Sequence, residues 1–170
     1  MGNEGAGRAL FESPIASSHS PSPMTSPLST SQHRVLSDAL RLVRDQRRRA
    51  EAEGAPFPPD LAWTTPFALG YLVGAVDGLC QAHGVAFDGT ALAIVGLVLD
   101  DTFGRPASDR LRQRAVTLLQ AGDAAFARGR PWGGNEAIGL ARGLTRPVGL
   151  VHLMRGDEGR MGGPVGGPLA

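Results

Sequence analysis

Lysine is absent from this 170-residue chain, and all 17 of its strongly basic residues are arginine. Aromatic residues make up only 5 % of the sequence, which argues against the stacking platforms that hold single-stranded nucleic acid. The one cysteine, Cys80, excludes an intrachain disulfide and gives no reason to expect an oxidising compartment. Long apolar runs are also missing. The stretch over residues 67–87 is interrupted by Asp77, Gln81 and His83, so we do not expect a membrane span.

Recognisable signatures of catalysis and targeting are missing as well. Metal-binding spacings such as Cys-x-x-Cys, a phosphate-binding P-loop, a dinucleotide fingerprint and a nucleophile elbow do not occur. No basic segment followed by an apolar run is found near the first residue, so we expect no secretory signal and a cytoplasmic location. The net charge of +1 excludes a strong overall field for nucleic acid or an anionic membrane. We therefore expect no metal and no cofactor.

Both ends of the chain are rich in residues that disfavour ordered structure. Residues 1–31 hold eight serines and four prolines, and residues 156–170 hold six glycines and two prolines. Segments of this composition bury too little apolar surface to offset the entropy lost on ordering. We predict two disordered tails around one helical domain over residues 32–155. Four Ser-Pro pairs in the first tail fit a solvated linker, which we favour, or a phosphorylated regulatory segment.

Apolar spacing and capping residues predict four to five helices in the central region. The predicted helices cover residues 32–53, 67–83, 89–103, 109–128 and a short segment 135–144, with caps at Ser31, Asp88, Ser108 and Asn135. No segment alternates with period two, which argues against a sheet. The third helix is apolar on all sides from Leu92 to Leu99, as expected of a helix at the centre of a fold. The predicted fold class is all-α, a compact bundle with that helix buried in the middle.

The most distinctive motif is a ladder of glycines, Gly70, Gly74 and Gly78, in the second predicted helix. Each step of four residues turns by only about 40° relative to the helix face, so the three share one side. Each interior glycine costs about 0.5–1 kcal/mol relative to alanine, so three together predict a compensating close contact. We favour packing against another helix of the domain, most simply the third through its Gly96, over a groove for a partner.

Two surfaces are candidates for binding a partner. The first is the glycine face together with Asp77 and Gln81, which border it. The second is a predicted loop over residues 130–136, where Trp132 either anchors an interface or covers the core, and where Asn135 follows paired glycines. The leading hypothesis is a non-catalytic helical module that binds another protein or a second copy of itself. The sequence does not identify that partner or the oligomeric state.

The first alternative is a nucleic-acid-associated factor. The first predicted helix carries an arginine-rich face that includes Arg41, Arg44 and Arg48. Acidic residues four positions away, as in Arg41 and Asp45, predict ion pairs on a solvated face instead, which we favour. A contiguous arginine patch without acidic partners would strengthen the nucleic-acid hypothesis.

The second alternative is a small enzyme that uses carboxylates or a metal. Its candidate residues are Asp77, Asp100, Asp101 and His83, the titratable groups nearest to apolar surroundings. No metal-ligand or catalytic spacing connects them, and the sequence cannot show whether they converge. The sequence thus does not decide whether the protein is an enzyme, and we favour a protein without catalytic activity.

Overall fold

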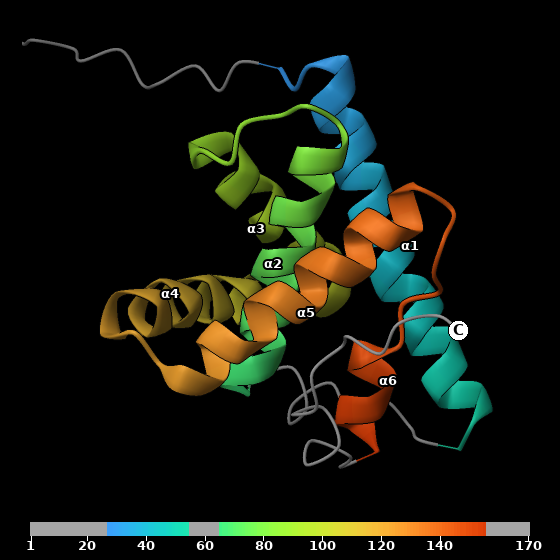
Figure 1. Cartoon of the computed structure of the whole chain (residues 1–170). Helices are drawn as coiled ribbons and strands as arrows, with labels where there is room; N and C mark the ends of the chain where they lie inside the picture. The colour runs from blue at the N-terminus through green and yellow to red at the C-terminus, as the bar shows by residue number, and fades with distance from the viewer. Residues whose placement is uncertain (1–26, 55–64, 156–170) are drawn as a thin grey trace, which may run out of the picture.

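The computed structural model describes residues 27–54 and 65–155, and six α-helices occupy most of these two ranges (Figure 1). The helices are α1 (Thr30–Ala52), α2 (Pro66–Ala82), α3 (Gly89–Phe103), α4 (Arg105–Ala121), α5 (Ala124–Ala141) and α6 (Gly149–Met154). No strand occurs within the described ranges, so the predicted all-α class is confirmed, with one helix more than expected. The predicted tails lie outside the described residues, apart from residues 27–31, where α1 already begins.

The buried central helix is α2. Thirteen of its 17 residues are buried, and it contacts each of the other five helices. Its start agrees with the prediction to within one residue, because Pro66 occupies the first turn and Thr65 caps it. The prediction that the third helix is the central one is wrong. Although α3 has the predicted bounds, its Leu92 and Leu97 are 44 % and 42 % exposed.

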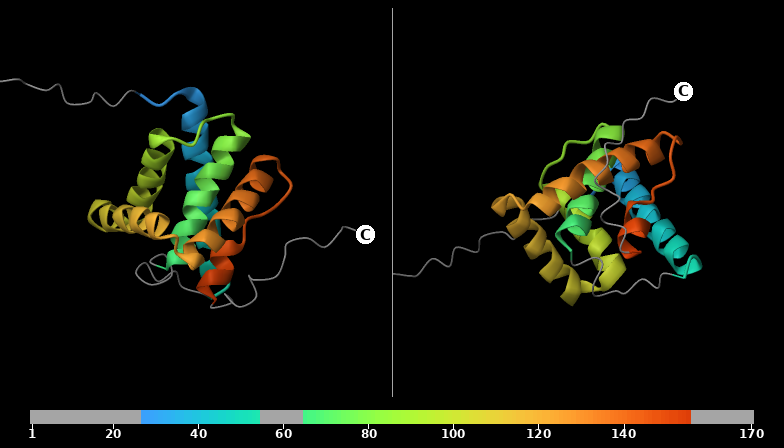
Figure 2. Two further views of the ribbon diagram at one scale, coloured as in Figure 1. Left: turned by 60° about the vertical axis from the view of Figure 1, so that its left-hand side comes forward. Right: turned by 60° about the horizontal axis from the view of Figure 1, so that its bottom comes forward.

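Glycines on both helices allow α5 to lie directly against α2 (Figures 1 and 2). A Cβ atom added to Gly70, Gly74 or Gly78 would lie 1.9–2.5 Å from a main-chain oxygen of α5. Likewise, a Cβ atom on Gly129 or Gly133 of α5 would lie 1.9–2.2 Å from a main-chain oxygen of α2. No side chain fits at such distances, so the packing interpretation of the glycine ladder is confirmed.

The partner of the ladder differs from the prediction. It is α5, whereas Gly96 of α3 faces the side chain of Arg112 on α4. The sequence signal for α5 was missed because its glycines were interpreted as loop residues. Their actual role is to allow close approach of two helix backbones.

The single helix predicted over residues 109–128 is wrong, because the chain turns at Gly122. This glycine adopts a φ of +65° and ends α4, and Asp123 then caps α5 by accepting hydrogen bonds from two main-chain amides at 2.9 Å. The apolar residues from Leu111 to Phe126 are thus divided between two helices.

The helix α5 also includes the predicted loop over residues 130–136 and most of the predicted helix over residues 135–144. It continues through Pro131, although a proline inside a helix typically costs about 3 kcal/mol or more. The tight packing of α5 on α2 offsets this cost. Three of the predicted caps are wrong, because the structure places Ser31, Ser108 and Asn135 inside helices. The residue that caps α1 is Ser29.

Candidate functional site

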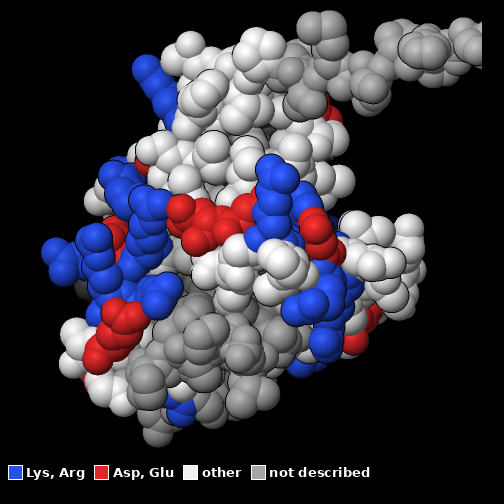
Figure 3. All heavy atoms as spheres, turned by 180° about the vertical axis from the view of Figure 1, so that it is seen from behind, with Lys and Arg blue, Asp and Glu red and all other residues white. Residues whose placement is uncertain are grey.

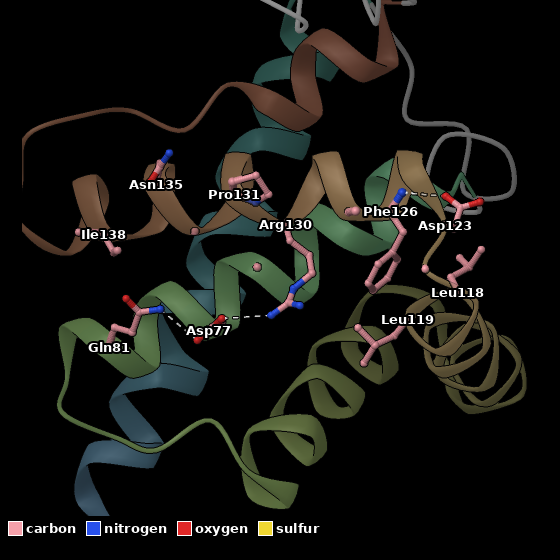
Figure 4. Close-up of a pocket in the computed structure, with 14 residues that line it drawn as sticks. Asp77, Gln81, Leu118, Leu119, Asp123, Phe126, Arg130, Pro131, Asn135 and Ile138 are labelled. Carbon is pink, nitrogen blue, oxygen red and sulfur yellow. Dashed lines mark hydrogen bonds and ion pairs between the residues drawn. The ribbon is translucent and has the colours of Figure 1, made fainter. Parts of the chain in front are cut away.

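An open groove of about 520 Å³ lies between α2, α4 and α5, and is called here the α2–α4–α5 groove (Figure 4). Its apolar end is formed by Leu118, Leu119 and Phe126, near the connection from α4 to α5. The other end carries Gln81 of α2 with Asn135 and Ile138 of α5. The groove therefore offers apolar contact at one end and hydrogen-bonding groups at the other.

An ion pair between α2 and α5 separates the two ends of the groove. The side chain of Arg130 extends from α5 toward Asp77, with 3.4 Å between Nη2 and Oδ2 (Figure 4). Gln81 donates a hydrogen bond to the other oxygen of Asp77 at 3.1 Å. The Nε atom of Arg130 is buried and has no hydrogen-bond partner among the described residues. A buried donor left unpaired costs about 1–3 kcal/mol, so this guanidinium gains from a further acceptor.

The apolar end of the groove continues onto the surface of α4. Leu119 lines the groove and is 46 % exposed, and Val116, one turn earlier on the same face, is equally exposed. Phe126, which also lines the groove, is buried. Exposed large apolar side chains beside a groove are typical of a surface that a partner covers.

Four of the seven residues predicted as partner-binding candidates line this groove. These are Gly74, Asp77, Gln81 and Asn135. Gly70 and Gly78 lie under α5, and Trp132 is half-buried against the core, so these three do not line it.

Arg130 and the leucines of α4 were not among the predicted site residues, although Arg130 begins the predicted loop over residues 130–136. Leu118 and Leu119 fell inside the single helix predicted over residues 109–128, which does not show the boundary between α4 and α5. The pair Gly122 and Asp123, a helix-ending glycine followed by a capping residue, is the signal that could have revealed them.

The residues of the predicted carboxylate site have separate partners. Asp100 accepts a hydrogen bond from Ser108, and Asp101 pairs with Arg44 of α1 at 2.7 Å. His83 lies 2.9 Å from Asp38 of α1, whereas Asp77 pairs with Arg130 of α5. Among the described residues, no three His, Cys, Asp or Glu side chains are grouped so that they could hold a metal ion. The four residues therefore do not form one site.

The arginines of α1 alternate with acidic side chains. On the face shown in Figure 3, basic and acidic groups lie side by side. The pairs are Arg41–Asp38 (3.1 Å), Arg44–Asp101 (2.7 Å), Arg47–Glu51 (2.9 Å), Arg48–Asp45 (3.9 Å) and Arg49–Glu53 (2.9 Å). The predicted pair of Arg41 with Asp45 is thus replaced by a pair with Asp38. The hydrogen bond from Arg49 lowers the pKa of Glu53 below its usual value.

A buried polar network joins α1, α2, α5 and α6 away from the α2–α4–α5 groove. Gln46 donates to the hydroxyl of Tyr71 at 2.9 Å, and that hydroxyl donates to Glu136 at 2.5 Å. The same carboxylate oxygen accepts from the main-chain amides of Val148 and Gly149 at 3.1 Å, where α6 begins. Burial, reinforced by the charge of Glu136, raises the pKa of Tyr71 well above its ordinary value. This network positions α6.

The single cysteine behaves as a small apolar core residue. Cys80 is fully buried, and this burial raises the pKa of its thiol to about 11. At neutral pH the thiol is therefore protonated and a poor nucleophile.

Comparison of the chain with protein families, curated proteins and solved structures finds no match. Within residues 27–54 and 65–155, no helix has both the length and the apolar character needed to cross a membrane. The functional proposal below is therefore based on the geometry of the site.

Proposed function

We propose that this protein is a non-catalytic helical binding module that takes a short segment of a partner protein into the α2–α4–α5 groove. The observation that carries the proposal is the combination, in one open groove, of exposed leucine surface and an arginine whose side chain is 37 % exposed and whose ion pair with Asp77 spans 3.4 Å. Interfaces commonly combine an apolar anchor with a few hydrogen bonds at its edge. A cytoplasmic location belongs to this proposal, and the lone buried thiol is compatible with it.

The two ends of the groove indicate the chemistry of the partner segment. An apolar side chain packed on Leu119 and Phe126 would anchor it, as in complexes where an amphipathic helix lies in a groove. A carbonyl or carboxylate oxygen of the same segment would accept a hydrogen bond from Arg130. Full burial of an exposed leucine side chain contributes about 1.5–3 kcal/mol, and Leu119 is 46 % exposed, so covering it is expected to contribute about half of that to affinity.

A pair of leucine-to-aspartate variants tests the proposal. Leu119→Asp places a charge in the apolar end of the groove, whereas Leu144→Asp changes a leucine that is 72 % exposed and does not line it. Each variant and the wild type are used as bait in the cells that produce the protein, and retained proteins are quantified by mass spectrometry. We expect at least one partner to be retained by wild type and Leu144→Asp and to be reduced about tenfold or more by Leu119→Asp.

Matching melting temperatures of the two variants serve as the folding control. Equal retention by both variants would contradict the proposal, because the groove would then make no contribution to binding. Sedimentation of the purified chain identifies the occupant further. A dimer that Leu119→Asp dissociates would make the occupant a second copy of the chain.

A further inference from the structure

A second concave surface, of about 850 Å³, lies between α1 and the segment that connects α5 to α6, and is called here the arginine groove. Four arginines line it: Arg41, Arg48 and Arg49 from α1, and Arg146 from the connecting segment. It shares no lining residue with the α2–α4–α5 groove. The two grooves are therefore separate surfaces.

Positive charge exceeds negative charge around the arginine groove. Among the residues that the structure describes, its four arginines and the nearby Arg155 share three carboxylates, those of Asp38, Asp45 and Glu53. Glu53 pairs with both Arg49 and Arg155, so one carboxylate serves two guanidinium groups. An anion that enters the groove would supply the missing negative charge.

Two of the lining arginines, Arg146 and Arg48, have guanidinium N–H groups that are available to a ligand. Arg146 is exposed and forms no ion pair with any residue in the described part of the chain. The ion pair of Arg48 with Asp45 spans 3.9 Å, and the Arg48 side chain is 79 % exposed, so this contact is weak. Guanidinium groups in this state bind phosphate oxygens through paired hydrogen bonds.

The remaining lining of the arginine groove consists of one carboxylate, one amide and three apolar side chains, and the carboxylate, that of Asp45, is paired with Arg48. Leu140 and Pro147, which are half-buried, give it an apolar part, whereas Leu42 is only 1 % exposed. Gln46 is buried, and its amide is occupied by the Tyr71 hydroxyl and by the main-chain amide of Leu150. A ligand with an uncharged planar or apolar body as well as an anionic group therefore matches the groove better than a bare ion.

We propose that the arginine groove binds a small phosphorylated molecule that has an apolar body, such as a nucleotide. Its volume falls within the range of about 300–1,000 Å³ typical of small-molecule sites. A nucleic-acid strand is less well matched, because it needs an extended basic track. Along α1, Arg44 and Arg47 lie outside the groove and are paired with Asp101 and Glu51.

Calorimetric titration of the full chain with ATP, tripolyphosphate and adenosine, without metal, tests the proposal. We expect ATP to bind at about 50 mM salt and more weakly at about 300 mM, and adenosine not to bind. Arg146→Gln and Arg48→Gln are expected to weaken ATP binding roughly tenfold each, as for loss of one charged hydrogen bond. The matched control is Arg114→Gln, since Arg114 of α4 is also exposed and unpaired among the described residues.

Three results would overturn the proposal. The first is an absence of ATP binding at the lower salt concentration, with melting temperatures showing that the protein is folded. The second is an equal loss of ATP binding in Arg114→Gln, which would indicate diffuse attraction to any arginine. The third is tighter binding of a single-stranded oligothymidine that Arg44→Gln weakens, which would identify a strand-binding face along α1.

Discussion

Tyr71 shows how one buried polar side chain connects four helices. Its hydroxyl both accepts from Gln46 and donates to Glu136, and its ring faces Gly149 so closely that a Cβ there would lie 2.5 Å from it. A glycine at the start of α6 is thus required by the tyrosine ring of α2. Because Tyr71 is the only tyrosine of the chain, its ionisation can be followed without interference from another residue.

We predict that Tyr71 ionises only when the protein unfolds. Burial raises its pKa in the folded state, whereas in the unfolded chain the pKa is near 10. The resulting stabilisation is complete below about pH 10 and is lost as the pH rises above that value, because the unfolded chain releases the proton first. An alkaline titration that follows tyrosinate absorbance and helical circular dichroism together should show coincident transitions. Tyrosinate absorbance that develops near pH 10 with full helicity retained would contradict the buried network.

At the scale of elements, the contact between α2 and α5 determines how the bundle is built. Glycines from both helices bring the two backbones together, and the remaining helices surround α2. The same contact places Arg130 of α5 opposite Asp77 of α2, and thereby forms the middle of the α2–α4–α5 groove. The glycine ladder thus contributes to the site by positioning it.

We predict that Gly74→Ala destabilises the protein by about 1–3 kcal/mol or more, because its methyl group would meet a main-chain oxygen at 1.9 Å. This cost outweighs the gain in helix propensity of about 1 kcal/mol. The matched control is Gly89→Ala in the first turn of α3, where no atom lies within 4 Å of the added methyl group. Chemical denaturation of both variants measures the difference, and Gly74→Leu should be worse than Gly74→Ala. Equal stability of Gly74→Ala and Gly89→Ala would refute the close contact.

The sequence predicts helices well where local signals determine them. Asp88 caps α3, Pro66 begins α2, and Gly104 ends α3, all as expected from residue type. It fails where tertiary packing determines the structure, most clearly at Pro131. Local signals assign this proline to a loop, whereas in the structure it lies inside α5, which packs on α2. The same error concealed half of the α2–α4–α5 groove, because Arg130 and Leu119 could be placed only after the boundary between α4 and α5 was known.

At the scale of the whole molecule, the net charge is near zero, but charged and apolar groups are unevenly distributed over the surface. Paired arginines and carboxylates cover much of α1, whereas the arginine groove retains unpaired positive charge and the α2–α4–α5 groove presents leucine. Since the two grooves share no residues, variants in one are expected to leave the other intact. Loss of nucleotide binding and loss of partner binding can therefore be distinguished.

Site-specific photocrosslinking tests the binding-module proposal most directly. A photoreactive phenylalanine analogue is introduced at Leu119 in the α2–α4–α5 groove or, as a control, at Leu144, and the cells that produce the protein are irradiated. We predict a crosslinked species of discrete mass from position 119 that is absent from position 144. No adduct at position 119, or the same adducts at both positions, would contradict the assignment of this groove as the partner-binding surface.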